Sequence, residues 1–176
     1  MLEGLLSGYV QLEVGALRPP PPAAAPQHPS QSQQQTPTAE SAIPPTVLPR
    51  FKTTAKRLGV SLDKLEALFD FNVDPFSLHA VTIPGKKNAE KSRNVALLAA
   101  SRSYLATGSW IADWQEVKSL CVDHNCYDRA NYVVNLKKGS GSWFKGVEPG
   151  KAVELSSGGV KEAEKLLKSL ADGSSE

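Results

Sequence analysis

The sequence predicts a mainly α-helical protein with one small β-hairpin, an α+β fold, joined to a long arm without a core. Two observations lead to this prediction. Apolar residues recur at intervals of three and four over several segments between residues 51 and 171, which is the spacing of one helix face. Two short segments rich in β-forming residues are separated by Pro149-Gly150, a pair typical of the turn in a hairpin.

The N-terminal 50 residues differ in composition from the rest of the chain. Residues 1–17 form a short apolar segment to which we assign no role, because nothing near them completes a core. Residues 18–50 contain the run Pro19–Pro22 and a tract of Gln, Ser, Thr and Pro. Such a composition cannot bury enough apolar surface to offset the entropy of ordering, so we expect residues 18–50 to be a disordered linker.

Charge and hydropathy exclude several classes of protein. The net charge of the chain is only +2, well below the strongly basic balance that indicates nucleic-acid binding by itself. The start of the chain has no basic region and carries Glu3 and Glu13, unlike a signal peptide. No apolar stretch reaches the length of about 18 residues that a membrane span needs. We therefore expect a cytoplasmic protein whose two cysteines are reduced.

Residues 51–88 are expected to form a helix–helix–strand prefix. Gly59 should end a first short helix, and Ser61 should cap a second one that runs to about Phe69. The content of Phe, Val, Thr and Ile predicts a strand over residues 75–83. We expect this prefix to pack onto the domain that follows it.

A central helix is predicted from about Glu90 to Ala106. It is apolar round most of its girth, so it should be buried, and Gly108 should end it. Trp110-Ile111 is interpreted as a short strand before the next helix.

A second helix of this domain is predicted over Trp114–His124. Asp113 precedes it and stands three residues before Glu116, which is the acidic form of a capping box. Asn125 is expected to end the helix in a left-handed conformation.

A third helix is predicted over Tyr127–Lys138, after a tight turn. Ala130, Val133 and Leu136 should face the core, with Tyr132 at its edge. The opposite stripe is polar and consists of Asp128, Asn131, Asn135 and Lys138. Two helices joined by a short turn, the second with a polar and amide-bearing outer face, are what a helix-turn-helix requires.

The last part of the chain should hold the hairpin and a final helix. Residues 142–146 and 151–155 are its expected strands. Trp143 and Phe144 are adjacent and point to opposite faces of a strand, so we expect only one of them to be buried. Ser156 or Ser157 should cap the final helix, whose core stripe consists of Val160, Ala163, Leu167 and Leu170.

The order of these elements resembles that of the winged helix-turn-helix superfamily. The string VELSSGGVKEAEKLL is similar to a junction frequent in that family, in which a strand ends in Leu and Ser or Thr and passes through Gly into an amphipathic helix. The resemblance covers residues 89–172 and rests on the order of elements rather than on an invariant motif. It implies that the third helix enters the major groove of DNA and that the hairpin, the wing of the family, lies along the DNA backbone.

The resemblance therefore indicates a non-enzymatic DNA-binding module, either a transcriptional regulator or an accessory domain, with double-stranded DNA as its partner. Asn131 and Asn135 each offer an amide that can pair with an adenine edge. The side chains suited to phosphate contacts are Arg129, Lys137, Lys138, Lys145 and Lys151, with a second basic cluster of Lys86, Lys87, Lys91 and Arg93.

Other features of the sequence favour different partners. Asp128 near the start of the third helix would repel phosphate unless it accepts a hydrogen bond from a cytosine amine. Val134 beside the polar stripe and an exposed aromatic residue on the hairpin would suit a protein partner, with the domain acting as an adaptor tethered by the linker. RNA binding through the same basic residues ranks below both, because no aromatic pair suited to stacking bases is present.

The sequence does not indicate catalysis or a metal site. Cys121, His124 and Cys126 lie close together, but structural zinc sites need four ligands and no second Cys/His pair follows. Cys121 falls on the apolar side of its helix, where a thiol behaves as a small hydrophobic group. Without a glycine-rich phosphate loop or a Ser-His-Asp pattern, we expect no enzyme, no cofactor, no small-molecule substrate and no membrane partner.

Overall fold

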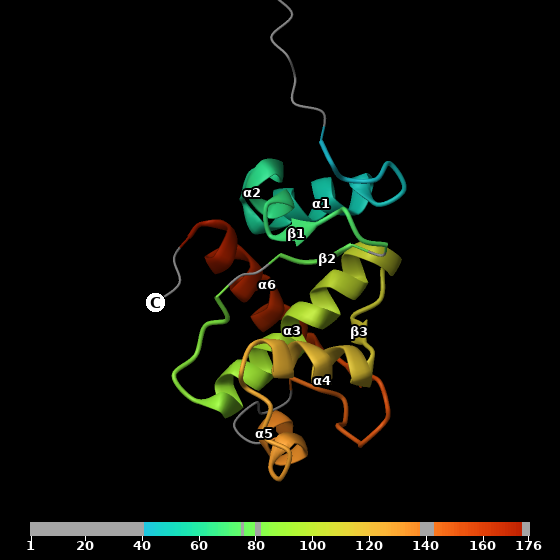
Figure 1. The fold of residues 1–176 in the computed structure, drawn as a ribbon. Coiled ribbons are helices and arrows are strands. Elements are labelled where there is room, and N and C mark those ends of the chain that lie inside the picture. Colours follow the sequence, from blue (N-terminus) through green and yellow to red (C-terminus); the bar gives the residue numbers. More distant parts are fainter. Residues whose placement is uncertain (1–40, 75, 80–81, 138–142, 174–176) are drawn as a thin grey trace, which may run out of the picture. The chain divides into compact units, whose positions relative to one another are not determined.

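A computed structural model describes residues 41–74, 76–79, 82–137 and 143–173, which all belong to one compact unit, Ala39–Glu176 (Figure 1). These residues are mainly helical with two small antiparallel sheets, in agreement with the expected α+β class. None of the helices in these ranges is long and apolar enough to cross a lipid bilayer. The segment 1–17 and most of the expected linker lie outside the described residues.

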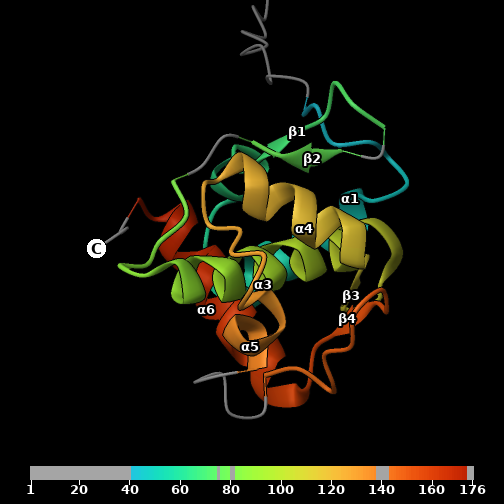
Figure 2. The ribbon, with the colours of Figure 1, turned by 60° about the horizontal axis from the view of Figure 1, so that its bottom comes forward.

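Helix α3 (Asn88–Thr107) is the centre of the fold. Figure 2 shows α4 (Trp114–Asp123), α5 (Tyr132–Lys137) and α6 (Ser157–Ala171) arranged around it. It contacts all three of these helices as well as the strands β2 (Ser77–Leu78), β3 (Ile111–Ala112) and β4 (Val153–Glu154). Val95–Ala100 is an unbroken run of buried residues, so almost every side of the helix packs against a neighbour. Gly108 ends it at φ 90°, a left-handed conformation that favours glycine. The prediction of a buried central helix is confirmed.

Helix α4 (Trp114–Asp123) begins where the sequence predicts and ends one residue before the predicted His124, which is its C-cap. The Asp113 carboxylate accepts hydrogen bonds from the backbone N–H groups of Gln115 at 2.8 Å and Glu116 at 3.0 Å. At the other end Asn125 has φ 53°, and the Cys126 N–H donates to the Cys121 carbonyl at 2.8 Å. This 6→1 bond is characteristic of a Schellman motif, which reverses the chain after the helix.

Helix α5 (Tyr132–Lys137) begins five residues later than predicted, so the expected start at Tyr127 is wrong. The Asp128 side chain accepts hydrogen bonds from the backbone N–H groups of Ala130 at 3.1 Å and Asn131 at 3.2 Å, which stabilises a turn in place of a helical turn. As a result Ala130 is exposed rather than in the core, and Tyr132 is buried rather than at its edge.

The hairpin strand β4 (Val153–Glu154) pairs on one side with β3 (Ile111–Ala112), where Ala112 faces Val153 and Ile111 faces Glu154. On the other side it continues into a bridge between Phe144 and Leu155, and the Lys145 N–H donates to the Glu154 carbonyl at 2.9 Å. The strand after the Pro-Gly turn therefore lies between two partners. One of them is distant in the sequence.

Trp143 and Phe144 are both half-buried and pack against the core, so the expectation that only one would be buried is wrong. Trp143 is held by α6 (Ser157–Ala171), because its carbonyl accepts the Ser156 N–H at 2.8 Å. A Cβ atom at Gly159 would lie 2.0 Å from the same carbonyl oxygen, so this close approach requires glycine.

The final helix α6 follows the predicted pattern. The Ser156 hydroxyl caps it by accepting the Gly159 N–H at 3.1 Å. Ala163 and Leu167 are fully buried, and Val160 and Leu170 are partly buried against the same core. The expected core stripe is confirmed.

The N-terminal part of the unit consists of α1 (Leu48–Leu58), α2 (Leu62–Glu66), β1 (Phe69–Asp70) and β2 (Ser77–Leu78), with β1 and β2 antiparallel. Gly59 ends α1 and the Ser61 hydroxyl caps α2, as predicted. Three boundaries differ from the prediction. Ile43 and Val47 are buried, so ordered packing begins before residue 50, α2 ends at Glu66 rather than near Phe69, and the strand is shorter than 75–83.

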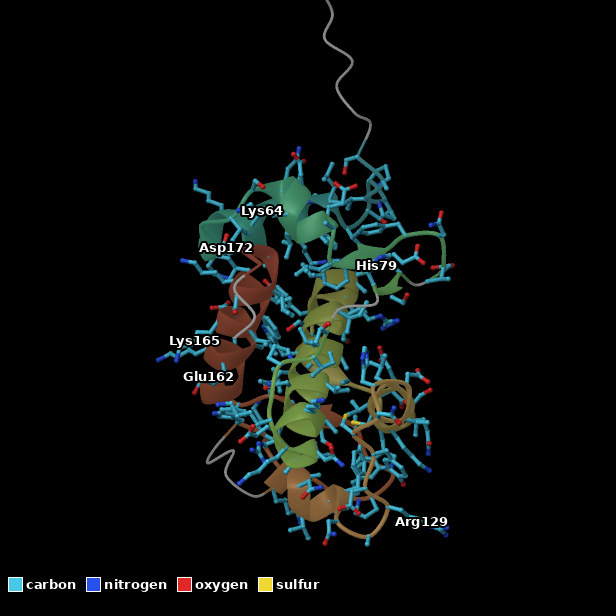
Figure 3. The ribbon with its side chains drawn as sticks, turned by 60° about the vertical axis from the view of Figure 1, so that its left-hand side comes forward. Lys64, His79, Arg129, Glu162, Lys165 and Asp172 are labelled. Carbon is cyan, nitrogen blue, oxygen red and sulfur yellow. The ribbon has the colours of Figure 1, made fainter. Side chains whose placement is uncertain are left out.

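This N-terminal part packs onto the helices that follow it. The Arg57 and Glu164 side chains form an ion pair at 2.8 Å between α1 and α6, and the Lys64–Asp172 pair (Figure 3) measures 3.3 Å. The Arg50 guanidinium donates to the Leu105 carbonyl at 2.9 Å, near the end of α3. The predicted prefix is thus part of the same compact unit as the residues after it.

Candidate nucleic-acid interface

The residues proposed to read DNA lie around α5 and the turn before it. Arg129 and Asn131 are on this turn and are exposed, and Figure 3 shows Arg129 extending away from the fold. Lys137 at the end of α5 is exposed, whereas Asn135 is half-buried. Leu136 is fully buried and anchors the helix to the core. Lys138 lies outside the described residues.

Both asparagine side chains lie against Asp128. The Asn131 amide donates to the Asp128 carboxylate at 2.9 Å. This hydrogen bond is the largest cause of an Asp128 pKa below its usual range, and the Asn135 side chain contributes to the same shift. The Asp128 carboxylate therefore occupies an amide donor of Asn131, one of the two residues that were expected to read bases. Asn131 keeps its amide oxygen available as an acceptor.

The hairpin lysines are paired with glutamates. The Lys145 ammonium lies 2.5 Å from the Glu154 carboxylate, and the Lys151 ammonium lies 2.6 Å from that of Glu148. The hydrogen bond from Lys151 lowers the Glu148 pKa, and the charge of Lys137 adds to this effect. The charge of Lys137 therefore acts on a carboxylate of the hairpin. Because these pairs are exposed they are weak, and the lysines can exchange partners at little cost.

The residues of the second basic cluster, Lys86, Lys87, Lys91 and Arg93, do not lie in one place. Lys86 and Lys87 are exposed before α3, whereas Lys91 is half-buried and lines a cavity. The Arg93 guanidinium donates to the Asn135 carbonyl at 2.9 Å and so connects α3 to α5. Of this cluster, Arg93 is the residue that the structure brings to the α5 surface.

Two further residues belong to this surface although the sequence reasoning did not assign them to DNA binding. Lys118 on α4 lies with its ammonium 5.5 Å from the centre of the Tyr127 ring, a cation–π contact beside the turn. Val134 on α5 is 52% exposed between the polar side chains. The helical position of Lys118, outside the buried positions Trp114, Val117 and Cys121, was the signal that could have identified it.

The core beneath the turn contains both cysteines. Cys121 and Cys126 are free thiols and fully buried, and the Ser92 hydroxyl donates to the Cys126 carbonyl at 2.8 Å. Burial raises the pKa of Cys121 to about 12, and burial also raises the pKa of Tyr132. Cys121 therefore lies in the core as a small hydrophobic group, as expected. Within the described ranges no cluster of three His, Cys, Asp or Glu side chains is placed to hold a metal ion.

The chain was compared with protein-family models, with curated proteins and with solved structures, and none of the three comparisons found a match. The geometry of the chain's own residues is therefore the basis on which a function can be proposed for it.

Proposed function

We propose that residues 89–172 form a winged helix-turn-helix domain that binds double-stranded DNA. The order of elements supports the fold: a central helix α3, a strand β3, the helices α4 and α5 joined by a short turn, a hairpin, and α6. The pairing supports it as well. Strand β4 lies between β3 and the Phe144 segment, so the hairpin is anchored to the helical core.

The observation that most supports DNA binding is the exposed surface formed by α5, the turn before it and the hairpin. Arg129, Asn131 and Lys137 are exposed there, and the hairpin adds Lys145 and Lys151. A short helix and a hairpin that both expose cations suit a groove flanked by two phosphate backbones. The buried free cysteines are consistent with a reducing, intracellular location.

Titration of labelled duplexes with the full chain tests this proposal. We expect binding at about 50 mM salt that weakens steeply as salt increases, since each phosphate contact releases counterions. Arg129→Ala and Lys137→Ala should each lower the slope of log K against log salt by about 1, while Lys161→Ala on α6 should leave it unchanged. Absence of binding to any duplex at about 50 mM salt would rule the proposal out.

Recognition of bases by the two asparagines can be tested separately from phosphate contacts. Asn131 is exposed and Asn135 is half-buried, so Asn131→Ala should relax the sequence preference more than Asn135→Ala does. Selection of bound sequences from a random duplex pool, carried out with each variant, measures this difference. Equal selectivity in both variants and in the unmodified chain would mean that neither amide reads a base.

A protein-docking function is the second candidate, favoured by a specific observation. The α5 surface neutralises much of its own charge, because Glu148 and Glu154 pair with the hairpin lysines, and Asp128 occupies an amide donor of Asn131. Val134 stands half-exposed among them. A mixed polar surface around an apolar centre is typical of protein interfaces.

This second function can be separated from the first by one substitution and its control. Val134→Asp should abolish recovery of a defined partner from nuclease-treated lysate, whereas Val73→Asp, at an equally exposed valine on another part of the unit, should not. A partner that is retained by Val134→Asp does not dock on α5. A partner that is lost on nuclease treatment was held through nucleic acid.

A further inference from the structure

A cavity outside the α5 surface brings together polar side chains that the proposed function does not use. It has a volume of about 520 Å³ and lies between the segment after β2, the first turns of α3 and the last turn of α4. Its volume falls within the range typical of small-molecule sites. His79, labelled in Figure 3, marks the side formed by the segment after β2.

The apolar part of the cavity comes from three segments. Leu78 belongs to β2, Ile83 to the stretch before α3, and Leu120 to α4. Ile83 is buried, and Leu78 and Leu120 are half-buried. All three side chains line the cavity. This lining can remove the apolar part of a ligand from water, at a gain of roughly 25 cal/mol per Å² of buried apolar surface.

The polar lining consists mostly of groups that can donate hydrogen bonds. Lys91 comes from α3, His124 from the end of α4, and His79 and Thr82 from the segment after β2. Within the part of the chain that the structure describes, the side chains of Lys91, His124 and Thr82 have no hydrogen-bond or ion-pair partner. Donors from three segments thus line one space, and these three side chains are not bound to an acceptor of the described residues.

Asp123 is the one carboxylate in this lining, and it too has no ion-pair partner among the described residues. Its carboxylate offsets the charge of Lys91, so Asp123 competes with a bound anion for the donors of the site. The ammonium of Lys91, the imidazole of His124 and the hydroxyl of Thr82 can donate together to the oxygens of one oxyanion.

We propose that this cavity binds a small organic molecule that carries a carboxylate or phosphate group on an apolar body. Lys91, His124 and Thr82 bind the oxyanion, and Leu78, Ile83 and Leu120 contact the apolar body. The site goes beyond the proposed DNA or protein surface and does not depend on it. Its ligand is defined by this combination of charge and apolar surface.

Calorimetric titration of the full chain with four probes tests the proposal, with NMR shifts of Ile83 and His124 to locate the site. Benzoate and phenyl phosphate should bind with a saturable Kd of about 1 mM or tighter. Benzyl alcohol and inorganic phosphate should each bind at least about tenfold more weakly, because each lacks one of the two required parts. The ratio between benzoate and phenyl phosphate identifies the preferred oxyanion.

Substitutions with opposite expected signs complete the test. Lys91→Met and His124→Gln should each weaken binding of the preferred probe about fivefold, and Asp123→Asn should strengthen it about twofold. Lys161→Met, the same charge change on α6, should leave binding unchanged. His124→Gln keeps the result informative if Lys91→Met fails to fold.

Four results would overturn the proposal: no saturable binding up to about 20 mM of either aromatic anion, equal binding of benzyl alcohol, equal binding of inorganic phosphate, or an equal loss in Lys161→Met. Equal binding of benzyl alcohol would mean that the cavity binds apolar molecules without recognising the anion. Equal binding of inorganic phosphate would mean that the apolar lining contributes nothing. An equal loss of affinity in Lys161→Met would mean a general effect of charge.

Discussion

The N-terminal part of the unit and the α5–hairpin surface make different kinds of polar contact. The N-terminal part is joined to α3 and α6 by pairs far apart in the sequence. Arg57 on α1 reaches Glu164 on α6, and Arg50 reaches the Leu105 carbonyl near the end of α3. These contacts exist only when the two segments are packed together, so they stabilise one arrangement of the elements.

The α5–hairpin surface makes its polar contacts mainly between near neighbours. Asp128 holds Asn131 three residues on, and Glu148 pairs with Lys151 at the same spacing. Contacts of this kind hold side chains in place within one surface but do not determine what the surface packs against. The difference indicates that the N-terminal part has a structural role and that the α5–hairpin surface is free to exchange partners.

The largest expected effect tests the structural role of the N-terminal part. Phe51 is fully buried, and its ring centre lies 5.5 Å from those of Phe69 and Phe76. Phe51→Ala should lower the free energy of unfolding by about 3–5 kcal/mol, measured by urea denaturation. Val134→Ala on α5 should change it by less than about 0.5 kcal/mol. A loss below about 1.5 kcal/mol for Phe51→Ala would mean that this part is not integral to the fold.

A smaller loss is expected where the hairpin meets α6. Gly159→Ala places a methyl group against the Trp143 carbonyl, so the backbone must shift, at a cost of about 1–3 kcal/mol in the free energy of unfolding. Thermal denaturation measures it, with Ser157→Ala at an exposed position of the same helix as control. An unchanged melting temperature for Gly159→Ala would show that the hairpin can move away from α6 freely.

The titration of Asp128, before α5, can be compared with that of Asp70 in the N-terminal part. Hydrogen bonds, chiefly from Asn131, hold the pKa of Asp128 below its usual range. Hydrogen bonds from Asn72 are likewise the main cause of a lowered pKa of Asp70. Because the folded pKa is depressed, the stabilisation is present above the unfolded pKa of about 3.9 and is lost as pH falls through the folded value. Carboxyl NMR titration should show that Asn131→Ala raises the midpoint of Asp128 and leaves that of Asp70 unchanged. A midpoint of Asp128 that stays low would assign the shift to another group.

The smallest effect distinguishes the two kinds of ion pair. A double-mutant cycle on Arg57 and Glu164, whose side chains are 41% and 23% exposed, should give a coupling free energy of about 0.5 kcal/mol. The same cycle on Lys151 and Glu148, which are 71% and 62% exposed, should give about 0.2 kcal/mol or less. The reverse order would contradict the view that the hairpin lysines exchange partners easily.

The sequence pattern predicted part of the α5 surface but not its hydrogen bonds. Helical spacing placed Asn131 and Asn135 on one outer stripe, and both are on the α5 side of the unit as expected. It did not predict that Asp128 would bond to the Asn131 side chain, because an acid at that position favours a capped turn as readily as a helical turn. Periodicity describes a helix once it has formed, but it does not decide between a helix and a turn that competes with it.

The sequence by itself determined the ends of most helices. Ser61, Asp113 and Ser156 cap helices, and Gly59, Gly108 and Asn125 end them, because each acts through hydrogen bonds or backbone angles within a few residues. The tertiary structure alone decided that β4 pairs with β3, that Trp143 and Phe144 are both half-buried, and that donors from three segments meet in one cavity. These features join residues far apart in the chain, and their free energy comes from burial and pairing that local patterns do not contain.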